Sequence, residues 1–311
     1  MPGLKRPSAR RPALFWAALL VALAVGLALG GGVLSRFTGD GGVTSSLHDQ
    51  VDRLEAENSA LKSRAAAGDG YAEATSAALL AGRLKGVPVV VVRAADADSG
   101  DVTAVSDRIK QAGGDVTGTL TLTRTLYADG QAERLRGVAD QVAPEGTTLK
   151  GADPAARAGD LLGALLLAKQ GAQAPSAGER RDALAALRDG GFVTYDGDNV
   201  APGRIAVVVS GGGVDAAGGS EGQAVGRLAS AISAHGAGAV LAGRTGSADG
   251  GGPIPVVRGD GALTRSLSTV DDVDTAVGRV ATALALASAA DGRYGAYGTG
   301  KGASGVAPTV K

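Results

Sequence analysis

The chain has 311 residues, no cysteine and a formal net charge of zero. The lack of cysteine excludes a disulfide framework, and few aromatic residues (3%) with no clustered Lys and Arg argue against a nucleic-acid surface. Stability must therefore come from an ordinary hydrophobic core, and the length suffices for one large domain or two small ones.

An uncharged apolar run near the N-terminus predicts a transmembrane helix at residues 13–35. No residue between Arg11 and Arg36 carries a charge, and a bilayer core needs roughly 20 apolar residues in a helix. The flank at residues 1–12 is basic and lacks acidic residues. The positive-inside rule then keeps the N-terminus in the cytoplasm and predicts a single-pass protein of the cell membrane with an extracytoplasmic C-terminal domain. A cleaved signal peptide is the alternative, although its apolar core usually spans only about 7–15 residues.

Two periodic patterns predict a parallel homodimer or a higher homo-oligomer. Small residues recur at every fourth position of the predicted span, a spacing that lets two membrane helices approach closely. Residues 36–67, a Gly-rich joint followed by a coiled-coil stalk, carry a heptad with leucine at d and Asn58 at the central a position. A single Asn at a selects a parallel pair in register. The alternative is an amphipathic helix packed on its own domain. The predicted dimerisation residues are Ala22, Gly26, Gly30, Leu47, Val51, Leu54, Asn58 and Leu61.

Residues 71–292 predict an exported globular α/β domain, and residues 293–311 a Gly-rich tail. Gly68-Asp69-Gly70 is expected to end the stalk helix. The continuous apolar runs at Val87–Ala94 and Arg204–Ser210 are typical of strands buried on both faces. Each run is followed by a loop, a helix and a second strand, which predicts two βαβ-like units and parallel pairing. The other expected elements are helices at 71–85, 101–111, 129–142, 157–169, 179–189, 220–234 and within 274–290, with strands at 115–123, 192–196 and 235–244.

Two short motifs resemble catalytic or nucleotide-binding loops without their structural context. Residues 295–302 read GAYGTGKG and resemble a P-loop, but Gly302 occupies the position of the magnesium-binding Ser or Thr. No strand is expected before this motif and no helix after it. Residues 218–222 match G-x-S-x-G, yet the preceding strand is too distant for a nucleophile elbow, and Ser220 is better explained as a helix N-cap.

Two further patterns could mark a cofactor or a metal. Gly211, Gly213 and Ala216 fit a dinucleotide fingerprint, but the helix is expected to begin too late for these glycines to sit at its N-terminus. The acid cluster Asp271, Asp272 and Asp274 could hold a hard cation, although Asp at a helix start is the ordinary explanation. We therefore predict no catalytic residue, no bound cofactor and no enzymatic activity.

Several sequence blocks together resemble the mycobacterial copper transport protein B family of actinobacteria. They are the membrane run, the heptad LHDQVDRLEAENSALK, and the blocks RAGDLLGALLL, ALRDGGFVTY, SAHGAGAVLAGR, STVDDVDTAVGRVATALAL and GRYGAYGTGKGA. The resemblance extends from about Ala13 to Ser304, and the C-terminal blocks are its most specific part. It implies a role in copper homeostasis or efflux at the cell envelope, with copper as a transported ion.

The residues themselves offer few copper ligands. Copper(I) prefers Cys or Met and copper(II) prefers imidazole, and the chain supplies only Met1, His48 and His235. A tight copper site within one chain is therefore not expected. Two alternatives to the copper role remain open at this point: a dimeric structural or assembly protein that docks an envelope partner, and an exported α/β ligand-binding domain or enzyme that uses the loop at residues 210–219.

Overall fold

The computed structural model describes residues 41–168, 175–197, 200–212 and 219–309. The chain divides into two compact units, Met1–Ala65 and Ala66–Lys311, and each is described by itself. The predicted transmembrane helix at residues 13–35 lies outside the described residues, as do Ala22, Gly26 and Gly30. Among the helices that are described, none combines the length and the apolar character needed to cross a bilayer.

Helix α3 runs without interruption from Gly41 to Leu80. The predicted helix end at Gly68-Asp69-Gly70 is therefore wrong, as is the start of a separate helix at residue 71. Glycine in a helix costs about 1 kcal/mol relative to alanine, and contacts within the second unit offset that cost. Asp69 accepts the backbone N–H of Val277 at 3.2 Å, and Ser76 and Leu80, on successive turns, are buried.

The second unit is built around one seven-stranded sheet with the strand order β3-β2-β1-β4-β5-β6-β7. All neighbouring strands are parallel except β3, which pairs antiparallel with β2. The central strands form because their residues are almost all apolar and can be buried on both faces. The strands are β1 (Pro88–Arg93), β2 (Asp115–Leu122), β3 (Val193–Tyr195), β4 (Ile205–Val209), β5 (Ala239–Ala242), β6 (Leu267–Val270) and β7 (Ala296–Tyr297).

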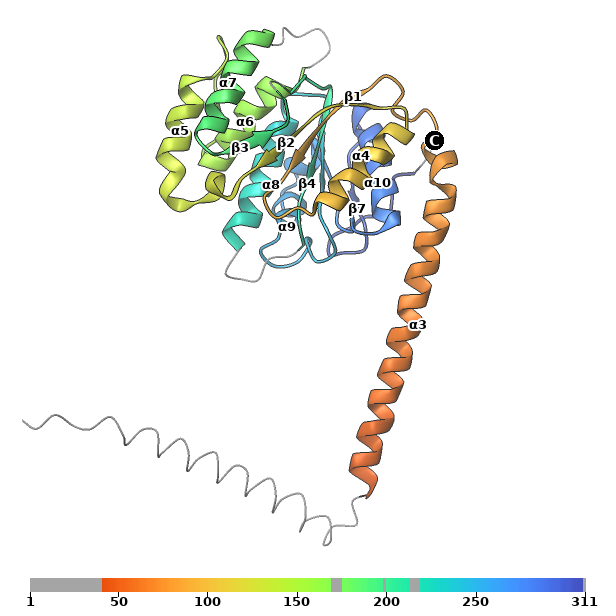
Figure 1. Cartoon of the computed structure of the whole chain (residues 1–311). Coiled ribbons are helices and arrows are strands. Elements are labelled where there is room, and N and C mark those ends of the chain that lie inside the picture. The colour runs from red at the N-terminus through yellow and green to blue at the C-terminus, as the bar shows by residue number, and fades with distance from the viewer. Residues whose placement is uncertain (1–40, 169–174, 198–199, 213–218, 310–311) are drawn as a thin grey trace, which may run out of the picture. The chain divides into compact units, whose positions relative to one another are not determined.

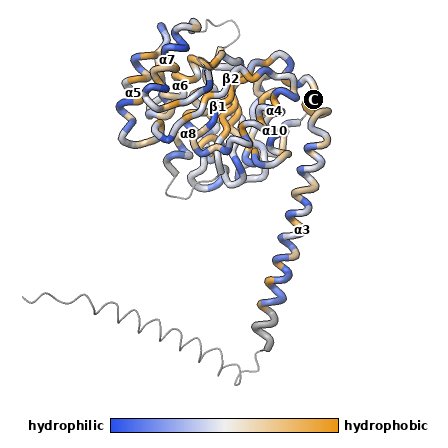
Figure 2. Tube along the Cα trace, viewed as in Figure 1, coloured by the Kyte–Doolittle hydropathy of each residue, from blue (hydrophilic) through white to orange (hydrophobic). Residues whose placement is uncertain are grey.

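Helices cover both faces of this sheet (Figure 1). Helices α4 and α10 pack together on one face, while α5, α6 and α8 form the layer on the other. The most hydrophobic part of the trace lies in the strands between these layers (Figure 2). The helices are α4 (Ser99–Gln111), α5 (Ala132–Gln141), α6 (Pro154–Leu166), α7 (Ala177–Asp189), α8 (Gly219–Ser233), α9 (Pro253–Arg258) and α10 (Ala276–Ala290).

The predicted α/β class and both βαβ units are confirmed. They are β1-α4-β2 and β4-α8-β5, each with parallel strands. Because β2 and β4 flank β1 on opposite sides, the chain reverses its direction of travel across the sheet between β1 and β4. In open parallel sheets, the crevice at the carboxyl ends of the strands on either side of such a reversal is the usual place for ligands.

Three elements were not predicted from the sequence: strand β6, helix α9 and strand β7. Strand β6 has the sequence LSTV, and its two polar residues Ser268 and Thr269 are buried, which breaks the apolar pattern of a central strand. Strand β7 has only two residues and lies within the Gly-rich segment at residues 293–311. That segment therefore contributes to the sheet.

The continuity of α3 gives a direct test at its two glycines. A β-carbon added at Gly68 has no atom within 4 Å, so Gly68→Ala should stabilise the helix by about 1 kcal/mol. We expect amide hydrogen exchange around residue 68 to slow by roughly fivefold. Gly82→Ala is the matched control, because its surroundings are equally open but its φ of +70° is strained for alanine. Unchanged exchange in Gly68→Ala would indicate a helix break after all.

Candidate functional site

The loops at the carboxyl edge of the parallel sheet carry most of the buried charge of the domain. Asp101, in the first turn of α4, is only 2% exposed. Its two carboxylate oxygens pair with Arg244 and Arg279, each at 3.0 Å. A buried carboxylate is stable only when it is compensated in this way. Asp101 therefore ties α4 to the loop after β5 and to α10.

A second buried carboxylate, Asp271, follows strand β6 directly. Its Oδ2 lies 2.7 Å from Nη1 of Arg258 in α9, and both side chains are almost fully buried. Its Oδ1 accepts the backbone N–H groups of Thr299 and Gly300 at 2.8 and 2.9 Å. Two consecutive backbone amides thus bind an anion, and that anion is the carboxylate of Asp271 itself.

This contact explains the P-loop-like motif at residues 295–302. A β-carbon at Gly298, whose φ is +115°, would lie 2.2 Å from Oδ1 of Asp271. Glycine is therefore required there so that the backbone can approach the carboxylate. No helix follows the motif within the described tail, and Asp271 occupies the position that a phosphate would need. In the structure the motif clamps the side chain of Asp271.

Asp272 lies beside this clamp and has an abnormal acidity. It is 4% exposed, and its Oδ1 has no hydrogen-bond partner in the described part of the chain. Burial, followed by the charges of Asp271, Asp274 and Asp69, raises its pKa to about 6, which Arg258 opposes. The carboxyl is thus held in an environment that favours its protonated form.

The acid cluster does not form a metal site. Within the described residues, no group of three or more His, Asp or Glu side chains is arranged to hold a metal ion. Asp271 is paired with Arg258, and Asp274 accepts hydrogen bonds from the backbone and hydroxyl of Thr245 at 2.8 and 3.1 Å. The N-cap of α10 is Thr275, so Asp274 directly precedes the start of the helix and none of the three acids is its N-cap.

The two histidines considered as copper ligands lie in different units. His235 Nε2 is 3.2 Å from Oδ1 of Asp160. The other oxygen of Asp160 accepts two backbone N–H groups at 2.6 Å. His235, which follows the end of α8, therefore has Asp160 of α6 as a structural partner. His48 lies in the stalk segment, defined here as residues 41–65 of α3, and its side chain is exposed. Met1 lies outside the described residues.

The loop after β4 was the other candidate for a ligand. Gly211 packs against Asp96, because a β-carbon there would lie 2.5 Å from its carboxylate. Gly213 and Ala216, the other members of the proposed fingerprint, lie outside the described residues. Helix α8 begins at Gly219, which places the described glycine well before the helix N-terminus, as the sequence analysis expected.

The heptad residues of the stalk segment are exposed within their own unit. Leu47, Val51, Leu54 and Leu61 are 52–62% exposed, and Asn58 is also exposed. The four apolar residues follow the heptad spacing along α3, so pairing through them stays a prediction.

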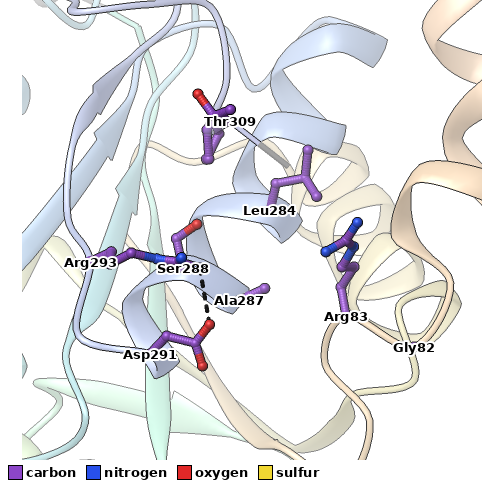
Figure 3. A pocket seen from close by; sticks show the side chains of 9 residues that line it. Gly82, Arg83, Leu284, Ala287, Ser288, Asp291, Arg293 and Thr309 are labelled. Atoms are coloured by element: carbon purple, nitrogen blue, oxygen red, sulfur yellow. Dashed lines mark hydrogen bonds and ion pairs between the residues drawn. The ribbon is translucent and has the colours of Figure 1, made fainter. Parts of the chain in front are cut away.

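A pocket of about 230 Å³ lies between the end of α3, helix α10 and the C-terminal segment (Figure 3). Arg83, Leu284, Ser288, Asp291 and Thr309 are among the residues that line it. Asp291 pairs with Arg293 at 3.0 Å across its rim, so these two charges neutralise each other. We assign no ligand to this pocket.

The fold and its carboxyl edge define a doubly wound α/β domain whose buried charges hold loops together. Comparison with known proteins then identifies the family: residues 8–308 match the family described as "Copper transport outer membrane protein, MctB". The chain is 38% identical to copper transporter MctB of Mycobacterium tuberculosis, in an alignment that covers 96% of this chain and 98% of the relative. It is 37% identical to copper transporter MctB of Mycobacterium leprae, with the same coverage. The chain belongs to the MctB family, and the resemblance read from the sequence is confirmed.

Several charged residues of the carboxyl edge were missed by sequence reasoning. Asp96 and Asp101 follow β1, and Glu221 begins the helix after β4. The available signal was their position, because acids placed just after buried parallel strands converge at one edge of the sheet. Arg258 had no such signal, since nothing in its short helix marks it as a partner for a distant carboxylate.

The raised pKa of Asp272 predicts a pH-dependent stability. Its stabilising contribution is complete below the unfolded pKa of about 4 and is lost as the pH rises through about 6. Asp272→Asn should therefore raise the free energy of unfolding at pH 7 by about 2 kcal/mol, with no gain at pH 4. Urea unfolding at several pH values measures this difference. Asp107→Asn, on an exposed face of α4, is the control and should change little at either pH.

Proposed function

We propose that this protein acts in copper transport at the cell envelope, as a membrane-anchored chain that limits cellular copper. The single observation that supports this proposal is the similarity to copper transporters over nearly the whole chain. The predicted span at residues 13–35 would supply the anchor, with the N-terminus in the cytoplasm and the α/β domain outside it. We assign the chain no catalytic step.

The chemistry of the described residues favours a role without a tight copper site in one chain. Copper binds strongly to Cys, Met and His, whereas the α/β domain holds its charged side chains in Asp–Arg pairs such as Asp101–Arg279 and Asp271–Arg258. His235 already has Asp160 as a partner. Copper would then be a transported substrate that is handled by an assembly of chains.

The assembly we propose begins with a parallel dimer through the stalk segment. Pairing would cover the exposed Leu47, Leu54 and Leu61, and burying a leucine contributes about 1.5–3 kcal/mol. Asn58 would face its counterpart at an a position, an arrangement available only when the two helices are parallel and in register. The small residues Ala22, Gly26 and Gly30 would continue the same contact within the membrane.

Charges beside the heptad support the same orientation. Glu57 occupies a g position and Lys62 the following e position. In a parallel dimer, a g residue lies next to the e residue five positions later in the partner chain. Each Glu57 would therefore lie beside a Lys62 of the other chain, which gives two attractive pairs for each dimer.

A second candidate function is a dimeric assembly protein that docks an envelope partner. The exposed heptad favours it, because dimerisation alone requires no copper chemistry. The two functions differ in what deletion of the gene does to copper handling.

Deletion of the gene should raise copper sensitivity and cell-associated copper, while zinc sensitivity stays unchanged. Complementation with the double variant His48→Gln, His235→Gln should restore both copper measurements, because neither imidazole is proposed as a copper ligand. Growth assays and metal analysis of washed cells test this. Unchanged copper handling in the deletion strain would favour the assembly function, and failed complementation by a stably expressed double variant would show that a histidine binds copper.

Reversing one charge of the stalk segment should weaken the dimer. Lys62→Glu places Glu57 beside a second carboxylate in the parallel pair, and we expect the dimer dissociation constant to rise about tenfold. The double variant Glu57→Lys, Lys62→Glu restores the attraction and should restore the dimer. Analytical ultracentrifugation of the full chain in detergent measures both. Arg53→Glu, which makes the same charge change at an outer c position, is the control. Equal effects at positions 53 and 62 would contradict the parallel arrangement.

A further inference from the structure

A second pocket lies where helices α6 and α8 meet a short 3-10 helix, Arg124–Tyr127, which follows β2. It has a volume of about 250 Å³ and is lined by Tyr127, Ala132, Pro154, Ala224 and Arg227, among others. Arg227 pairs with Asp153 at one side, 2.9 Å apart. The remaining walls are largely small and apolar. This combination of an apolar lining with a few polar groups is typical of a small-molecule site.

Polar groups without partners lie next to this pocket. Glu221, Ala224 and Arg227 follow one another at three-residue spacing along α8, so Glu221 continues the same helix face toward the carboxyl edge of the sheet. Oε1 of Glu221 and the hydroxyl of Tyr127 are both fully buried, and neither has a hydrogen-bond partner in the described part of the chain. Leaving such a group unpaired costs about 1–3 kcal/mol, and a ligand that pairs with it would recover part of that cost.

Two acidic residues, Asp96 and Glu221, and one basic residue, Arg124, set the charge around the Tyr127 hydroxyl and the Glu221 carboxyl. Burial and the charge of Asp96 raise the pKa of Glu221, while Arg124 lowers it. Burial raises the pKa of Tyr127 too, and the charges of Asp96 and Glu221 add to this effect. The charges of Asp96 and Glu221 thus both act on the Tyr127 hydroxyl. Asp96 and Arg124 are solvent-exposed, so this end of the site is open to ligands.

We propose that this pocket binds a small molecule through a protonated amine. The ammonium group would donate to Glu221 and lie near Asp96, and the Tyr127 hydroxyl would bond to a neighbouring oxygen of the ligand. The carbon skeleton would occupy the small-residue pocket beside Ala132 and Ala224. The position fits the fold, because Asp96 follows β1 and Glu221 follows β4, the two strands that flank the reversal of the sheet.

The test uses pairs of probes that differ only in an amine and a hydroxyl. They are ethanolamine with ethylene glycol, 5-aminopentanol with 1,5-pentanediol, and glucosamine with glucose. Thermal unfolding of the full chain in detergent should shift upward by about 3 °C with at least one amine at ten times its dissociation constant, and not with its hydroxyl counterpart. Isothermal titration gives the dissociation constant.

Two variants connect any binding to this site. Glu221→Gln removes the charge at constant shape and should weaken amine binding at least tenfold. Tyr127→Phe removes only the hydroxyl and should weaken it about fivefold, which provides an independent test if the first variant fails to fold. Glu145→Gln, an exposed glutamate elsewhere, should bind as the unmodified chain does. The proposal is overturned if no amine stabilises the chain, if both members of every pair act equally, or if Glu221→Gln binds unchanged.

Discussion

The pairing of one buried carboxylate, Asp271, organises the C-terminal part of the domain. A carboxylate this deeply buried is tolerated only when nearby donors compensate for its lost hydration. Arg258 supplies the opposite charge, and the backbone amides of Thr299 and Gly300 supply the remaining hydrogen bonds. Strand β6, helix α9 and the tail are thereby held at one point. The same arrangement leaves Asp272 crowded by like charges, so the site that fixes the tail also creates the most perturbed acid of this loop.

Much of the fold could be predicted because the central strands are solidly apolar. Val89–Val92 and Ile205–Val209 can only be satisfied by burial on both faces, which gives a parallel sheet with helices on both sides. The predictions were wrong where tertiary contacts override a local preference. Gly68 and Gly70 suggested a helix end, but Asp69 accepts a hydrogen bond from the first turn of α10 and later residues of α3 are buried, so the helix continues.

The polar sites were harder to predict than the fold, because their partners are distant in sequence. Asp271 and Arg258 are separated by a strand, and Asp271 and Thr299 by a helix. Motif reasoning did reject a nucleotide site in the GAYGTGKG stretch, yet it could not tell that the glycines serve an internal carboxylate. The heptad could be recognised because its pattern is local in sequence, and its pairing with a second helix stays a prediction.

The two edges of the sheet bear on how copies of this domain meet. Edge strand β3 has three residues and β7 has two, so few unpaired backbone N–H and C=O groups remain for another strand to recruit. Short edge strands are a common protection against edge-to-edge aggregation. A neighbouring copy of the domain therefore finds only two or three residues of sheet edge to extend.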